Sequence, residues 1–128
     1  MKLPDDQLGE KLAMADDRKI TISPAGRRVV VAWRGRVVAD SADALSLKEH
    51  GYPPVLYVPR KDVDMRFLRK SESHTLCPYK GVASYYSLAA DGAVEKDAVW
   101  TYETPHPGVA SIKDHLAFYR DRVEISSP

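Results

Sequence analysis

Residues 82–102, VASYYSLAADGAVEKDAVWTY, contain the pattern that decides the fold class. Asp91-Gly92 stands between two runs, 82–88 and 94–102, that are rich in β-branched and aromatic residues. Asp-Gly between two such runs is a strong signal for a β-hairpin with a two-residue turn. We therefore predict two antiparallel strands here. Alternation along the second strand is expected to place Ala98, Trp100 and Tyr102 on one face.

The flanking sequence predicts further strands and a few short helices. Arg34-Gly35 separates the apolar runs 28–33 and 36–39, which indicates another hairpin, because glycine accepts the positive φ of a tight turn. Asp40, Ser41 and Asp62 are expected helix caps. The other expected strands are 55–58 and 117–125, and the expected helical segments are 42–50, 63–68 and 111–116. The predicted class is mainly β, a β-rich α+β domain of compact antiparallel sheets with two or three short helices.

Composition and length indicate one globular domain. The chain has 128 residues, of which 44% are hydrophobic and 29% are charged. Residues 1–19 carry too few apolar groups to become ordered alone, so we predict a mobile, polar N-terminal arm there. The single β-rich domain is expected over residues 20–128.

The charge balance restricts the classes of partner. Nineteen basic and eighteen acidic side chains give a formal net charge of +1, whereas nucleic-acid binders usually have a strongly basic face. No run approaches the ~20 apolar residues of a membrane helix, and no signal peptide is evident. We therefore expect a soluble, cytoplasmic protein that binds neither nucleic acid nor membrane. Self-association stays open.

Cys77 is the only cysteine and lies in the stretch SESHTLCPYKGVASYY, residues 71–86. His74 and Lys80 flank it and are candidates to favour a thiolate. Pro78 disfavours the α region for Cys77, so the three side chains cannot share one helix face. A buried thiol and a reactive thiol both remain open. A zinc site would need histidines scattered through the chain and no second cysteine exists, so we expect no metal and no cofactor.

Large aromatic residues and a few charged residues together favour a pocket for a small molecule. Buried phenol and indole groups usually need polar partners, and a core of satisfied tyrosines is the competing interpretation. Asp62 and Asp64 form an acidic pair of the kind that binds magnesium, but no glycine-rich phosphate loop precedes them. A structural role at a helix start is the favoured interpretation of that pair.

Several motifs follow one another along the chain. They are ADS (39–41), Glu49, LYVPR (56–60) with Asp62-Val63, TLCPYKGVASYY (75–86), AVWTY (98–102), Ile112 and AFY (117–119). In this order they resemble the domain of unknown function 427 family. The resemblance extends over about residues 20–125, and its most specific part is the Cys-Pro-Tyr-Lys-Gly box.

The resemblance implies a fold similar to the β-tent fold of methionine sulfoxide reductase B-like domains. Many such relatives hold zinc between two Cys-x-x-Cys pairs, which this chain lacks. The family is sometimes labelled nucleotidyltransferase-like, but the Gly-Ser loop and spaced acidic residues of that chemistry are missing here. The resemblance transfers no catalytic residues.

We therefore hypothesise a domain that binds a small polar or anionic ligand, and whether it is also an enzyme stays open. Arg60 and Lys80 are expected to bind the anionic part, since a guanidinium can grip it bidentately. Glu49 and Cys77 are the candidate reactive groups. The alternatives are a protein-interaction module, through the basic hairpin or the loop 104–108, and a thiol or redox role of Cys77. The expected ligand-binding residues are Tyr57, Arg60, Asp62, Lys80, Trp100 and Tyr102.

Overall fold

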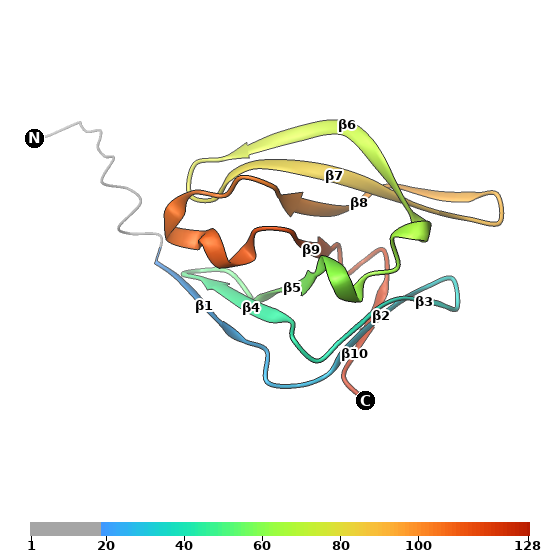
Figure 1. Cartoon of the computed structure of the whole chain (residues 1–128), viewed down its shortest axis with the longest axis horizontal. Coiled ribbons are helices and arrows are strands. Elements are labelled where there is room, and N and C mark those ends of the chain that lie inside the picture. The colour runs from blue at the N-terminus through green and yellow to red at the C-terminus, as the bar shows by residue number, and fades with distance from the viewer. Residues whose placement is uncertain (1–18) are drawn as a thin grey trace, which may run out of the picture.

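The computed structural model describes residues 19–128, which form a mainly β structure of antiparallel sheets (Figure 1). The predicted N-terminal arm lies, apart from Lys19, outside these residues. The helical segments in the described part are three 3-10 helices. The elements are β1 (Ile20–Pro24), β2 (Val29–Trp33), β3 (Arg36–Ser41), β4 (Leu45–Glu49), β5 (Val55–Pro59), η1 (Arg60–Asp62), η2 (Met65–Phe67), β6 (Leu68–Cys77), β7 (Gly81–Ala90), β8 (Ala93–Tyr102), η3 (Pro107–Ile112), β9 (His115–Phe118) and β10 (Glu124–Ser126).

A seven-stranded antiparallel sheet has the order β1-β4-β5-β9-β8-β7-β6. The predicted hairpin of residues 82–102 is confirmed as β7–β8. Asp91 and Gly92 have φ values of 52° and 81°, so both turn residues are left-handed, as the favoured two-residue hairpin turn requires. Figure 1 shows β6, β7 and β8 side by side on one side of the molecule.

A three-stranded sheet, β10-β2-β3, contains the other predicted hairpin. Its turn residues, Arg34 and Gly35, both have positive φ, at 52° and 77°. Buried side chains of this sheet, including Val29, Val31 and Val38, pack in one hydrophobic cluster with residues of the larger sheet such as Leu88. Burial of these apolar groups holds the two sheets together.

A second hydrophobic cluster lies where β4, β5, β7, β8 and β9 approach η3. Its buried members are Leu47, Tyr57, Ala83, Tyr102, Val109, Ile112 and Ala117. In Figure 1, η3 lies at the same end of the molecule as the turn between β6 and β7. A backbone hydrogen bond of 2.9 Å from His106 N to Lys80 O joins the two regions. The aromatic residues of interest border this second cluster.

The helix expected over residues 42–50 is wrong, because this segment contains strand β4. β4 pairs with β1 on one side and β5 on the other, and Leu47 and Glu49 point into the buried side. The expected caps have other partners: Asp40 forms an ion pair with Arg28, and the Ser41 hydroxyl donates to Asp62 at 2.6 Å. Pairing on both sides thus outweighs the local helical signals.

The other helical expectations are only partly met. Residues 63–68 contain the single 3-10 turn η2, and its cap is Asp64, whose carboxylate accepts the Arg66 backbone N–H. The turn expected at 111–116 lies earlier, as η3. The last strand is divided into β9 and β10 by a turn near Arg122. Over residues 19–128, no helix is long and apolar enough to cross a membrane.

Candidate functional site

A pocket of about 340 Å³ opens beside the second hydrophobic cluster. Its walls come from β4, β5, β7 and β8, together with the loop before β5, the turn before β7 and the residue after β9. The lining is apolar and aromatic except at one charged place. The lining residues are Leu47, Glu49, Tyr52, Pro53, Val55, Tyr57, Lys80, Tyr85, Trp100, Tyr102 and Tyr119.

The charged part of the lining is a salt bridge between Glu49 and Lys80. The Lys80 Nζ atom lies 3.0 Å from Glu49 Oε1, and the two side chains are only 12% and 11% exposed. Lys80 Nζ also donates to Cys77 Sγ at 3.6 Å. A tight turn, closed by the 3.2 Å bond from Lys80 N to Cys77 O, directs the ammonium toward the end of β4. The pocket therefore has a polar end held by β4 and this turn.

Trp100 belongs to the aromatic part of the pocket lining. Its Nε1 donates to the Tyr57 hydroxyl at 3.3 Å, and the two rings meet edge to face, with centroids 6.3 Å apart at 86°. The Tyr119 ring packs at 4.6 Å from Trp100 with a tilt of 46°. Tyr85 pairs with Trp100 across β7 and β8, and its hydroxyl shares a 2.9 Å hydrogen bond with Thr75. Such ring pairs add stability beyond area burial and fix the ring positions.

Three phenols of the lining are held in their neutral form. Burial raises the pKa of Tyr57 to about 12, because the phenolate would lose its hydration. Burial likewise raises the pKa of Tyr102. The pKa of Tyr119 is raised to about 12 by burial and then by a hydrogen bond with Tyr85. These hydroxyl groups keep their protons at neutral pH and can donate hydrogen bonds.

The structure brings five of the sequence-selected residues together at the pocket. They are Glu49, Tyr57, Lys80, Trp100 and Tyr102. Cys77, the other candidate reactive group, is not among the lining residues. It is half-buried against the second hydrophobic cluster, and its Sγ accepts a hydrogen bond from Lys80.

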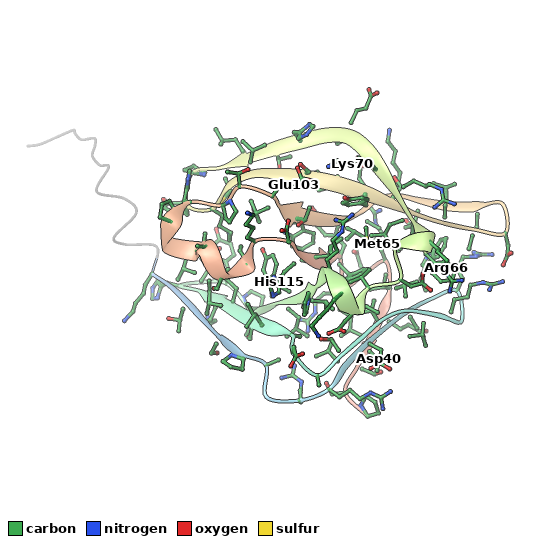
Figure 2. The ribbon with its side chains drawn as sticks, in the orientation of Figure 1. Asp40, Met65, Arg66, Lys70, Glu103 and His115 are labelled. Carbon is green, nitrogen blue, oxygen red and sulfur yellow. The ribbon has the colours of Figure 1, made fainter. Side chains whose placement is uncertain are left out.

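Arg60 lies away from the pocket, on the opposite face of the sheet. It donates to the Tyr86 hydroxyl at 3.3 Å. Successive residues of a strand point to opposite faces, and Tyr85 faces the pocket while Tyr86 packs in the first hydrophobic cluster. Lys70 also stacks on Tyr86, with Nζ 5.3 Å from the ring centroid. Lys70 forms a salt bridge of 2.6 Å with Glu103, and Figure 2 labels both residues near β6 and β7.

Asp62 is also remote from the pocket. Its carboxylate accepts the Ser41 hydroxyl and pairs with Lys61 at 2.9 Å. The hydrogen bond from Ser41, followed by that from Lys61, lowers the pKa of Asp62. Asp62 thus ties η1 to the end of β3, which is a structural contact.

Some lining residues were not selected from the sequence. Leu47 was assigned to a helix and Tyr52 to a loop, while Tyr119 was expected inside the last strand. A sequence signal for Leu47 was present. Polar residues alternate with Leu45, Leu47 and Glu49, as in a strand with one buried face. No comparable local signal marks Tyr52 or Tyr119, because they reach the pocket from loops.

The histidines do not assemble around Cys77. His74 donates its Nδ1–H to the Glu72 carbonyl, and His115 donates its Nδ1–H to the Lys113 carbonyl. Among residues 19–128, no group of three or more His, Cys, Asp or Glu side chains is arranged to hold a metal ion.

The fold and the pocket define a small antiparallel β domain with an aromatic cavity and one buried ion pair. A family model described as domain of unknown function (DUF427) matches residues 21–127, so the chain belongs to this family, as its motifs predict. No curated protein matches the chain.

Proposed function

We propose that this domain binds a small organic molecule in the pocket between the aromatic wall and the Glu49–Lys80 salt bridge. The observation that carries the proposal is the composition of one concave site: aromatic rings surround a pair of charged side chains that are nearly excluded from water. Ligand pockets commonly combine apolar and aromatic walls with a few placed polar groups.

The salt bridge supports binding better than it supports a purely structural role. Removing two charges from water costs several kcal/mol per ion, and well-packed apolar residues at such places are often as stabilising. The neighbouring residues Leu47 and Val55 show that apolar side chains fit this region. The position of the Glu49–Lys80 salt bridge at the wall of a cavity is therefore best explained by a ligand that forms polar contacts with these two side chains.

The available hydrogen bonds indicate how a ligand would be held. The Tyr57 hydroxyl accepts from Trp100 and can donate its own proton. Lys80 is a second donor at the polar end. A ligand with an oxygen acceptor at one end and an apolar or planar body would satisfy both parts of the pocket. In this proposal Arg60 and Asp62 take no direct part.

The indole N–H signals of the ¹⁵N-labelled protein test the proposal. The chain has two tryptophans, and Trp33 lies in the first hydrophobic cluster, away from the pocket. A Trp33→Phe variant assigns the Trp100 signal. In a screen of small aromatic amides, ketones and carboxylates against the wild-type protein, we expect some compounds to shift the Trp100 signal and leave the Trp33 signal in place.

Trp33 is the internal control in that experiment. Equal shifts of both indole signals would indicate a general effect on the protein. A screen in which no compound moves the Trp100 signal at millimolar concentration would overturn the proposal, because fragments of this size bind pockets with affinities on the order of 1 mM.

A further inference from the structure

We infer that the ligand of this pocket is an uncharged, planar molecule that presents a hydrogen-bond acceptor, such as an amide, lactam or ketone. This inference rests on the proposed function and adds the chemical class of the ligand. It narrows the polar or anionic ligand that the sequence predicts to an uncharged polar one, because Lys80 is paired with Glu49 and Arg60 lies on the other face of the sheet.

The formal charges of the lining cancel. In the described part of the chain, Glu49 and Lys80 are the charged residues of the lining, and they contact each other at 3.0 Å. The phenols of Tyr57, Tyr102 and Tyr119 add no charge at neutral pH, because a tyrosine ordinarily titrates near pH 10 and burial raises the pKa of these three further. Over the described lining residues, the formal charges that a ligand meets therefore sum to zero.

A charged ligand would be an uncompensated third charge. A carboxylate close enough to bind Lys80 also lies beside the Glu49 carboxylate, which repels it. An ammonium or amidinium group near Glu49 is repelled by Lys80 in the same way. Burial of an unpaired charge is costly, whereas a neutral acceptor loses only hydration that the new hydrogen bonds replace.

The donors that face the pocket match a neutral acceptor. An ammonium group has three N–H donors, and in the described part Lys80 uses them toward Glu49 Oε1 and Cys77 Sγ, which leaves one for a ligand. The Tyr57 hydroxyl proton is a further donor. A carbonyl oxygen has two lone pairs and can accept both.

The aromatic rings favour a planar body and introduce one competing effect. Flat rings stack on Trp100 and Tyr119, but aromatic faces also attract cations. Arg122 already lies 6.0 Å from the centroid of the Tyr119 ring. With that ring occupied and Lys80 in the same pocket, we expect the repulsion of a cation to outweigh its attraction to the rings.

Three probes of nearly the same shape test the inference: benzamide, benzoate and benzamidine, which are neutral, anionic and cationic at neutral pH. Each is titrated into wild-type protein while the Trp100 indole signal is followed, with the Trp33 signal as control. We expect benzamide to bind best, with a Kd about tenfold lower than that of either charged probe.

The outcomes separate the two proposals. If benzoate or benzamidine binds as tightly as benzamide or tighter, a pocket exists but the inference about its charge is wrong. If none of the probes moves the Trp100 signal up to their solubility limits, and the wider screen is also negative, both the pocket function and its ligand class fail.

Two variants change the charge of the pocket lining while nearly keeping the size of the replaced side chains. In Glu49→Gln the lining becomes positive, and benzoate should become the tightest probe. In Lys80→Met it becomes negative, and benzamidine should become the tightest, since methionine keeps most of the lysine stem. Well-dispersed amide spectra and a cooperative thermal melt verify that each variant folds. A folded variant whose probe order equals that of the wild type would overturn the inference.

Discussion

Trp100 is the residue that fixes the shape of the pocket. Its ring borders the main pocket and a smaller apolar hollow of about 80 Å³, and Val55 and Tyr119 border both as well. The hydrogen bond to Tyr57 sets the position of the indole, and Tyr119 packs against it. Because the indole N–H needs a partner when it leaves water, the Tyr57 hydroxyl has a structural role besides the binding role proposed for it.

Tyr57→Phe should therefore destabilise the fold by about 1–2 kcal/mol, since the Trp100 N–H loses its acceptor inside the protein. The free energy of unfolding from urea titrations measures the effect. Tyr86→Phe is the matched control: Tyr86 is also buried, but its hydroxyl bonds an exposed arginine, Arg60, that can turn to water. Equal costs for the two variants would contradict the role given to the Tyr57 hydroxyl.

The Glu49–Lys80 contact shows how far single residues could be selected from the sequence. Aromatic and charged residues in the family-like motifs identified five members of the pocket lining. Arg60 was grouped with them because it belongs to the LYVPR motif (56–60) and its guanidinium can bind an anion bidentately. The side on which a residue lies depends on strand pairing and alternation, and Arg60 follows β5 into η1. Local composition does not contain that information.

At the scale of elements, hairpins with a short turn were predictable because their signal is local. Asp91-Gly92 and Arg34-Gly35 adopt the left-handed conformations that their chemistry allows. The position of Ala98 was not predictable: it packs in the first hydrophobic cluster with Val99, rather than with Trp100. Asp97 has φ of 53° and the β7–β8 register shifts nearby, so the simple alternation is interrupted.

β4 illustrates why the remaining elements were missed. Its residues are compatible with a short helix, and the strand exists because β1 and β5 supply hydrogen bonds on both sides. The strand at β5 was predicted, but β1 lies well before β4 along the chain and was not among the predicted strands, so pairing on both sides of β4 was not expected. β-propensity reflects packing against neighbours more than any preference of the isolated segment.

The turn between β6 and β7 positions Lys80, and Gly81 is its critical residue. Gly81 has φ of +119°, and an added Cβ would lie 3.3 Å from the Thr104 backbone oxygen. Gly81→Ala should lower the free energy of unfolding by about 2 kcal/mol or more. The backbone would be strained, and the added Cβ would crowd the loop whose His106 N–H donates to the Lys80 carbonyl. Thermal and urea unfolding measure the loss.

Gly108→Ala is the matched control for that change. Gly108 lies in the nearby η3 segment, has no positive φ, and has open space where a Cβ would be. It should be nearly neutral. If Gly81→Ala is equally neutral, the turn adapts easily and Lys80 is not held in place by its backbone.

At the scale of the molecule, the pocket lies beside one of two hydrophobic clusters. The first cluster joins the two sheets, whereas the second combines η3 with the pocket walls. The stability of the fold and the shape of the pocket therefore share residues such as Leu47, Tyr57 and Tyr102. A ligand that binds the folded pocket should stabilise the whole domain by an amount that grows with the logarithm of its concentration above Kd.

The buried tyrosines predict a loss of stability at alkaline pH. The pKa of Tyr57 is about 12 in the folded state, and that of Tyr102 is also raised, whereas an unfolded tyrosine titrates near pH 10. Above pH ~10 the unfolded chain gives up these protons and the folded chain keeps them, so stability is complete below pH ~10 and falls as pH rises toward 12. Each such phenol contributes a slope of up to about 1.4 kcal/mol per pH unit. Tyr119 should contribute less, because 38% of it is exposed to solvent.

Urea titrations between about pH 9 and 11.5, the range in which the slope develops, measure this effect, and tyrosinate absorbance follows ionisation in the same samples. Tyr57→Phe should reduce the slope of unfolding free energy against pH by the contribution of about one proton, relative to wild type. The buried phenols should ionise together with unfolding, because the folded protein protects them from hydroxide and disfavours the phenolate. If all seven tyrosines of the chain ionise while the protein stays folded, the walls of the pocket are far more open to water than the structure shows.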